Sequence, residues 1–393
     1  MARGVKGVVA HGGGPTAVIN ASLAGLVQAH QRSGDTLFGA VGGIAGLLDA
    51  RFTELTTLGG DGLWDEIAQA PGSALGSSRR PLAEGDCERM VEQFRRLDVR
   101  RFFYTGGNGS MGTALRIEHC ARELGYELQV IGIPKTIDND LLVTDHSPGY
   151  GSTARFFACA ARDAGEDNRS LPSPICILEV LGRNAGWIAA ATALARHAED
   201  DAPHVILLPE RRLSLDAIAA EVERVYRRLG RAFVVVCEGQ RDEQGLTFGA
   251  HVDRPGSPVH ELASNLGHTL ALALTAKLGI RARAEKPGLV GRSCGLFASL
   301  ADRQSAYRCG AGAARAAAIG ESAVMVALRR ECDDPYETSV FTVALGEVAG
   351  RERLLPEPWI AEGGMDVTRE FLEYARPLTG PVPAWKRLPG ISE

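Results

Sequence analysis

The sequence lacks cysteines paired in the way that zinc sites and disulfide frameworks require. Its eight cysteines are scattered over 393 residues, with no Cys-x-x-Cys spacing and no nearby histidine at zinc-ligand spacing. Scattered cysteines of this kind are typical of reduced thiols in a reducing compartment. We therefore expect free thiols and no structural zinc.

Long apolar runs and blocks of one charge are also missing. No segment approaches the roughly 20 apolar residues of a membrane helix, and Met1-Ala2-Arg3 leads into a strand-like segment rather than a signal-peptide pattern. The net charge of -5 is spread along the chain, which argues against nucleic acid or a membrane surface as partner. We expect a cytoplasmic protein that acts on small molecules.

Strand-like and helix-like segments alternate along most of the chain. The apolar segment 4–10 precedes glycines and the helical spacing of 16–29, and 100–104 precedes 111–124 in the same way. The pattern recurs at 128–133, at 175–180 before a helix expected at 182–195, at 205–208, and at 233–237 before a helix around 260–278. Such alternation predicts an α/β fold with parallel sheets covered by helices. Because single cores stop growing near roughly 250–300 residues, we expect two lobes with a cleft between them.

The first strand ends in the loop Gly12-Gly13-Gly14-Pro15-Thr16. Glycines let the backbone approach a ligand, and the free N–H groups at a helix start bind anions. An ordinary strand-to-helix turn explains the glycines equally well. The loop is neither Gly-x-Gly-x-x-Gly nor followed by Gly-Lys-Ser/Thr, so it is neither a dinucleotide fingerprint nor a P-loop.

A second loop, Gly106-Gly107-Asn108-Gly109-Ser110, also lies between a strand and a helix. Asn108 is suited to bind a phosphate or a metal-bound water, and we expect Ser110 to be the N-cap of the helix. A plain capped helix entry is the alternative interpretation.

The third loop, 134–140, places Lys135, Thr136, Asp138 and Asp140 on one turn after an apolar strand. On an extended segment, residues i and i+2 point the same way, so one carboxylate can bind a cation while the other accepts a proton. Capping of turns is the ordinary role of such aspartates. Together, the three loops supply the cation, metal ligand and base that phosphoryl transfer requires.

Three motifs resemble the phosphofructokinase family. They are Pro134-Lys135-Thr136-Ile137-Asp138-Asn139-Asp140, Thr144-Asp145-His146-Ser147-Pro148-Gly149-Tyr150-Gly151-Ser152 and Glu179-Val180-Leu181-Gly182-Arg183-Asn184-Ala185-Gly186-Trp187. Shorter matches follow in order from Gly13-Gly14 through Leu75–Arg79, Pro209-Glu210, Cys237–Gly239 and Lys286–Gly288 to 371–378. The resemblance implies transfer of a phosphoryl group to the 1-hydroxyl of fructose 6-phosphate.

The resemblance also implies a role for individual residues. Asp138 is the base that takes the hydroxyl proton, with Lys135 and Thr136 as the other catalytic residues. The donor-binding residues are Gly13, Gly14, Arg79, Asn108, Gly109 and Ser110. The substrate-binding residues are Thr136, Asp138, Leu181, Gly182, Arg183, Glu238, Arg283 and Arg292. Asn108 and Asp140 are the expected ligands of Mg²⁺.

Signals for the donor conflict. Lys135 matches members that use pyrophosphate, in which a lysine neutralises the leaving phosphate. Gly109 matches ATP-using members, because a carboxylate at this place excludes the α-phosphate of ATP and glycine leaves room. We favour pyrophosphate and keep ATP as the alternative.

The acceptor side also departs from the family pattern. Pro174 stands where many members have an arginine, and Gly291 precedes Arg292 where a glutamine is usual. Another ketose phosphate, or a sensor that binds sugar phosphate without turnover, therefore remains open. A nicotinamide-dependent dehydrogenase is a further alternative, which the missing fingerprint disfavours.

The resemblance finally implies a domain division and an assembly. We expect a phosphoryl-donor lobe of residues 1–150 and about 290–325, and a sugar-phosphate lobe of 151–289 and about 326–393. A homodimer or homotetramer is expected.

Overall fold

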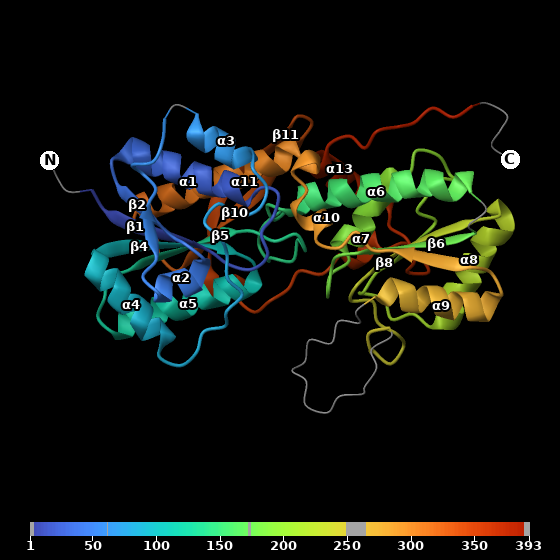
Figure 1. Cartoon of the computed structure of the whole chain (residues 1–393), viewed down its shortest axis with the longest axis horizontal. Helices are drawn as coiled ribbons and strands as arrows, with labels where there is room; N and C mark the ends of the chain where they lie inside the picture. The colour runs from blue at the N-terminus through green and yellow to red at the C-terminus, as the bar shows by residue number, and fades with distance from the viewer. Residues whose placement is uncertain (1–3, 61, 172–173, 249–264, 389–393) are drawn as a thin grey trace. The chain divides into compact units, whose positions relative to one another are not determined.

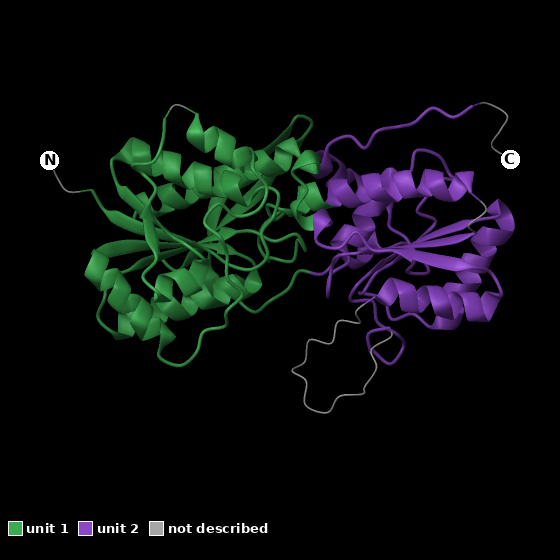
Figure 2. Cartoon of the chain, viewed as in Figure 1, with its two compact units in different colours: residues 1–153, 292–353 green, residues 154–291, 354–393 purple. Residues whose placement is uncertain are grey.

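The computed structural model describes residues 4–60, 62–171, 174–248 and 265–388. They form two compact units, each made from two stretches of chain (Figure 2). Unit 1 contains residues 1–153 and 292–353, and unit 2 contains 154–291 and 354–393. In the part of the chain that is described, no helix has both the length and the apolar character needed to cross a bilayer.

Unit 1 is built on a seven-stranded sheet with the order β11-β10-β5-β4-β1-β2-β3 (Figure 1). Its strands are β1 (Lys6–His11), β2 (Thr36–Ala40), β3 (Phe52–Glu54), β4 (Val99–Gly106), β5 (Gln129–Pro134), β10 (Val324–Asp333) and β11 (Tyr336–Ala344). Pairing is parallel from β2 to β10, and only the outer pairs β2–β3 and β10–β11 are antiparallel. The carboxyl ends of β1, β4 and β5 therefore lie next to one another at one edge.

Helices cover both faces of this sheet (Figure 1). One face carries α1 (Ile19–Ser33), α3 (Leu63–Gln69) and α11 (Leu300–Ala318); the other carries α2 (Gly43–Leu48), α4 (Asp86–Leu97), α5 (Asn108–Glu123) and α12 (Leu345–Val348). Strand residues alternate between the two cores: Val8 and Phe102 join one, Val9 and Phe103 the other. This period of two buries both faces, as parallel sheets require.

Unit 2 contains a parallel four-stranded sheet with the order β7-β8-β6-β9. Its strands are β6 (Ile175–Val180), β7 (Val205–Leu207), β8 (Ala232–Cys237) and β9 (Ala282–Glu285). Its helices are α7 (Trp187–Ala191), the 3-10 turns η1 (Thr192–Ala195) and η3 (Glu357–Trp359), α8 (Leu215–Leu229), α9 (Leu266–Leu278) and α13 (Arg369–Thr379). Helices α6 (Tyr150–Ser170) and α10 (Val290–Ser293) span the unit boundaries, and the turn η2 (Gly295–Phe297) follows in unit 1.

Two sequence-based expectations need correction here. Residues 326–353, expected in the sugar-phosphate lobe, lie in unit 1 because β10 pairs with β5 and β11 pairs with β10. The helix expected at 182–195 is confined to α7 and η1. Part of the helix expected around 260–278 is α9, and residues 260–264 lie outside the described residues.

Candidate functional site

The three loops singled out in the sequence follow β1, β4 and β5 at the same edge of the unit 1 sheet. The N–H of Gly12 donates to the carbonyl of Thr105 over 2.8 Å, which joins the first loop to the end of β4. The Lys135 ammonium donates to the carbonyls of Gly12 (2.9 Å) and Gly14 (2.7 Å). Gly13 has a φ of 77°, a left-handed conformation that favours glycine. Backbone and lysine together fix the first loop against the third.

Three cationic side chains gather around Gly14. A Cβ added to Gly14 would lie 2.6 Å from Nη1 of Arg292 and 3.1 Å from Nη2 of Arg79, so both guanidinium groups lie close to this glycine. Lys135 completes the set, which we name the Gly14 cation group: Arg79, Lys135 and Arg292. Its mutual repulsion is relieved when an anion binds among the three charges.

The electrostatics of Lys135 reflect this crowding. The side chain is 4% exposed. Its pKa is lowered from 10.5 to about 8, mainly because burial penalises the charged form and then because Arg292 lies nearby; Arg79 acts in the same direction, and Asp138 opposes it. A bound phosphate would raise the pKa of this lysine again, because a nearby negative charge favours the ammonium.

Asn108 and Asp140 meet across the second and third loops. Nδ2 of Asn108 donates to Oδ2 of Asp140 over 3.1 Å. Their remaining side-chain oxygens, Oδ1 of Asn108 and Oδ1 of Asp140, are both buried and have no hydrogen-bond partner. Burial raises the pKa of Asp140.

These two oxygens fit Mg²⁺ in chemical type. Magnesium prefers hard oxygen ligands and is often held by one or two protein groups together with substrate phosphates. Among the described residues, no cluster of three or more His, Cys, Asp and Glu side chains is arranged to bind a metal by itself. A magnesium ion at Asn108 and Asp140 therefore needs the donor phosphates as additional ligands.

The turn of the third loop is not the extended segment expected from the sequence. Asn139 is fully buried with a φ of 54°, so the backbone between Asp138 and Asp140 is not extended. The Asn139 side chain accepts from the N–H of Ser147 over 2.9 Å, which stabilises this conformation. The N–H of Asp138 donates to Oγ1 of Thr136 over 3.1 Å. The i, i+2 argument for parallel carboxylates is therefore wrong, although both remain on one turn.

The second loop differs from expectation at Ser110. Helix α5 begins at Asn108 with Gly107 as N-cap, so Ser110 lies inside the first turn rather than capping it. A Cβ on Gly106 would lie 2.0 Å from Oγ of Ser110, and a Cβ on Gly12 would lie 2.4 Å from it. This hydroxyl thus packs between the first two loops. Gly109 faces open space, with nothing within 4 Å of an added Cβ.

In unit 2, the predicted sugar-phosphate residues follow β6 and β8. Gly182 has a φ of 127°, and its carbonyl accepts from the N–H of Gly239 over 3.1 Å. This contact brings the loops together, with Nε of Arg183 at 4.0 Å from Oε1 of Glu238. Burial raises the pKa of Glu238, and Arg183 opposes this shift. Leu181 precedes Gly182 on the same half-buried loop.

The two other arginines predicted to bind substrate lie elsewhere. Arg283 pairs with Asp167, and in the sheet register it stands opposite Cys176, four residues before the carboxyl end of β6. Arg292 belongs to unit 1 and to the Gly14 cation group. Within unit 2, Arg183 therefore lies near Glu238, and neither Arg283 nor Arg292 belongs to this pair.

Sequence reasoning assigned no role to an ion pair beside this loop, which joins buried Glu179 to exposed Lys286. Glu179, 2% exposed, accepts from the N–H of Gly267 over 2.8 Å and lies 2.5 Å from the ammonium of Lys286. Both residues belong to motifs quoted for the resemblance. The sequence therefore drew attention to both residues, but it did not reveal that they pair, because they lie far apart in the chain.

Comparison with known proteins shows the family of this chain. The model of the family described as Phosphofructokinase matches residues 6–317. The chain belongs to the phosphofructokinase family. This confirms the resemblance and the predicted α/β fold.

Three known proteins illustrate what this chain is similar to. Pyrophosphate–fructose 6-phosphate 1-phosphotransferase of Rhodospirillum rubrum is 38% identical over 384 residues, which cover 95% of this chain and 94% of that protein. The solved pyrophosphate-dependent phosphofructokinase of Nitrosospira multiformis has a TM-score of 0.87 at 32% identity, covering 99% of this chain and 95% of that chain. Sulfofructose kinase of Alkalicoccus urumqiensis is 32% identical over 357 residues, 90% of this chain and 91% of that protein.

Proposed function

We propose that this chain transfers a phosphoryl group from pyrophosphate to the 1-hydroxyl of fructose 6-phosphate. The observation that carries the proposal is the Gly14 cation group. Lys135 donates to the carbonyl of Gly14, and the guanidinium groups of Arg79 and Arg292 lie close to the same glycine, which suits a short, densely charged donor such as pyrophosphate. The relative from Rhodospirillum rubrum matches this chain over nearly its full length and is named for the same donor and acceptor, which supports the proposal.

Each residue of the third loop has a task in this proposal. Asp138 accepts the proton of the attacking hydroxyl as the new O–P bond forms. Thr136 donates to the migrating phosphoryl group. Lys135 and Arg79 stabilise the charge that develops on the leaving phosphate, and Arg292 binds the donor rather than the sugar phosphate.

Asn108 and Asp140 would hold Mg²⁺ through their two buried Oδ1 atoms. Bound there, the ion would neutralise charge on the pyrophosphate. In unit 2, Arg183 suits the sugar phosphate and Glu238 the sugar hydroxyls. The donor and sugar-phosphate roles of the two units, a homodimer or homotetramer, and a cytoplasmic location stay predictions.

ATP is the second candidate donor because Gly109 leaves open space on α5. A different acceptor is favoured by one packing feature of unit 2. A Cβ on Gly291 would lie 2.5 Å from the ring of Phe157, which is fully buried, so this ring takes the room of the usual glutamine. One relative of similar sequence is named sulfofructose kinase, a name that gives a different acceptor.

Two substitutions separate the donors. Lys135→Gly should depress turnover with pyrophosphate far more than any turnover with ATP, because the small leaving phosphate of pyrophosphate relies strongly on the charge of Lys135. Gly109→Asp should abolish residual ATP use and leave pyrophosphate use largely intact. Gly112→Asp is the matched control, since Gly112 lies in the same helix with equally open surroundings. A wild type that uses only ATP, with a harmless Lys135→Gly, would refute the proposal.

A further inference from the structure

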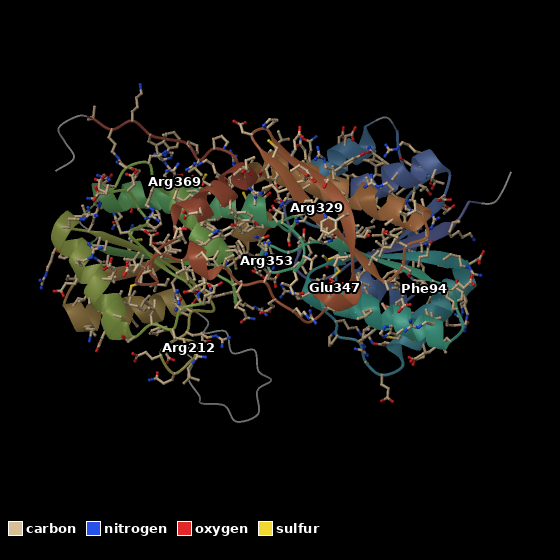
Figure 3. All side chains as sticks on the ribbon, turned by 180° about the vertical axis from the view of Figure 1, so that it is seen from behind. Phe94, Arg212, Arg329, Glu347, Arg353 and Arg369 are labelled. Carbon is tan, nitrogen blue, oxygen red and sulfur yellow. The ribbon has the colours of Figure 1, made fainter. Side chains whose placement is uncertain are left out.

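One arginine outside every motif contacts the catalytic turn at several points. Arg353 lies in the segment that follows α12 and is labelled in Figure 3. Its Nε donates to the carbonyl of Asn139 over 3.2 Å, and its Nη1 donates to the carbonyls of Thr144 and Asp145, both over 2.7 Å. Its backbone N–H donates to the carbonyl of Asp140 over 2.8 Å. A single residue thus binds both ends of the loop 139–145.

This loop needs external support because its backbone is strained. Asn139 has a φ of 54° and Val143 a φ of 62°. Asparagine tolerates this region, but a β-branched residue such as Val143 rarely adopts it. Strained conformations persist when the surroundings over-determine them.

A second set of contacts holds the far end of the same loop to β10. The N–H of Asp145 donates to the carbonyl of Leu328 over 2.8 Å, and the N–H of Leu328 donates to Oγ1 of Thr144 over 3.0 Å. These contacts anchor residues 144–145 independently of Arg353. At Asn139 and Asp140, next to Asp138, the support comes from Arg353, Asn108 and Ser147.

We propose that Arg353 is a positioning residue for phosphoryl transfer, holding the turn that carries Asp138 and Asp140 in its reactive geometry. The proposal rests on the function proposed above. A guanidinium presents several donors in a fixed planar arrangement, so it can bind three carbonyls at once, whereas an ammonium is a compact point charge. The charged donors also make these hydrogen bonds stronger than neutral ones.

The test compares Arg353→Met, Arg353→Lys and the wild type. Methionine keeps much of the side-chain volume and the backbone N–H but removes the side-chain donors. Arg351→Met is the matched control, because Arg351 is an exposed residue of the same segment. We measure kcat and KM for both substrates, the Mg²⁺ concentration for half activation, and hydrogen–deuterium exchange of residues 137–147.

A positioning role predicts a specific pattern. In Arg353→Met, kcat should fall about 10- to 100-fold, since a small displacement of catalytic groups has this effect. KM for the sugar phosphate should stay within about twofold, half activation should need more Mg²⁺, and the amide of Ser147, which donates to Asn139, should exchange faster. Arg353→Lys should recover part of kcat, and Arg351→Met should match the wild type.

Other outcomes overturn the proposal. An unchanged kcat in Arg353→Met, with or without faster exchange, would leave Arg353 a structural contact only. A fall in kcat that Arg351→Met reproduces would also refute it. If Arg353→Met does not fold, Arg353→Lys decides by the same kcat and exchange criteria. A wild type that transfers no phosphoryl group would instead refute the proposed function.

Discussion

Lys135 is a buried cation whose charge depends on pH. Its pKa in the free protein is lowered from 10.5 to about 8, so the ammonium is charged below about pH 8 and loses its proton above it. The folded state therefore binds fewer protons than the unfolded chain between about pH 8 and 10.5, and this group makes stability rise with pH across that window.

The role proposed for Lys135 requires its charged form, so activity should fall with rising pH where stability rises. If the charged ammonium binds pyrophosphate, kcat/KM for pyrophosphate, which reports the free enzyme, should descend above about pH 8. In Lys135→Arg the guanidinium stays charged, so this descent should disappear even if activity is lower. The same descent in both proteins would assign it to another group or to the substrate.

Asp138 is the second residue with a direct prediction. Asp138→Asn keeps the size of the side chain and removes its ability to accept a proton. We expect kcat to fall by about 10²–10⁴-fold, with KM values and the circular dichroism spectrum close to the wild type. Steady-state kinetics with pyrophosphate measures this, and near-normal turnover would show that Asp138 is not the base.

At the residue scale, the sequence could identify residue types but not all their neighbours. Lys135, Asp138 and Asp140 are close in the chain, so their shared turn was predictable. The place of Arg292 beside Gly14 depends on chain segments far apart, and so does the contact of Arg353 with Asn139. Asn139's left-handed backbone follows from the buried Ser147 contact, which local pattern does not reveal.

At the scale of elements, the strand–loop–helix units were predictable because their apolar periodicity is local. Helix α5 begins earlier than expected because Gly107, not Ser110, is its N-cap. Helix α7 is short despite the apolar spacing of 182–195, since the residues before Trp187 form the loop that contains Gly182 and Arg183.

The packing of α10 against α6 gives a prediction at this scale. Gly291→Gln restores the residue usual in the family but inserts a side chain where Phe157 packs. Overpacking of this kind costs about 1–3 kcal/mol, so we expect a lower melting temperature and no gain in affinity for fructose 6-phosphate. Gly112→Gln, in open surroundings, is the control. Unchanged stability with tighter sugar-phosphate binding would contradict this interpretation of the acceptor side.

At the scale of the whole molecule, each unit is assembled from two separate stretches of chain. The sequence indicated this arrangement only through the family resemblance, and it misassigned 326–353 because strand pairing across distant segments has no local signal. Unit 1 thereby gains β10, whose contacts with Thr144 and Asp145 support the loop 139–145. The error in the boundary thus concerned a segment that matters for the site.

The donor is the central claim for the whole molecule, and one competition experiment tests it most directly. The protein is mixed with fructose 6-phosphate, excess Mg²⁺ and equimolar pyrophosphate and ATP, and ³¹P NMR follows both donors and the sugar product. We predict that pyrophosphate is consumed, that the 1-phosphate of the sugar and orthophosphate appear in equal amounts, and that the ATP signals stay unchanged. Accumulation of ADP while the pyrophosphate signal persists would contradict the account.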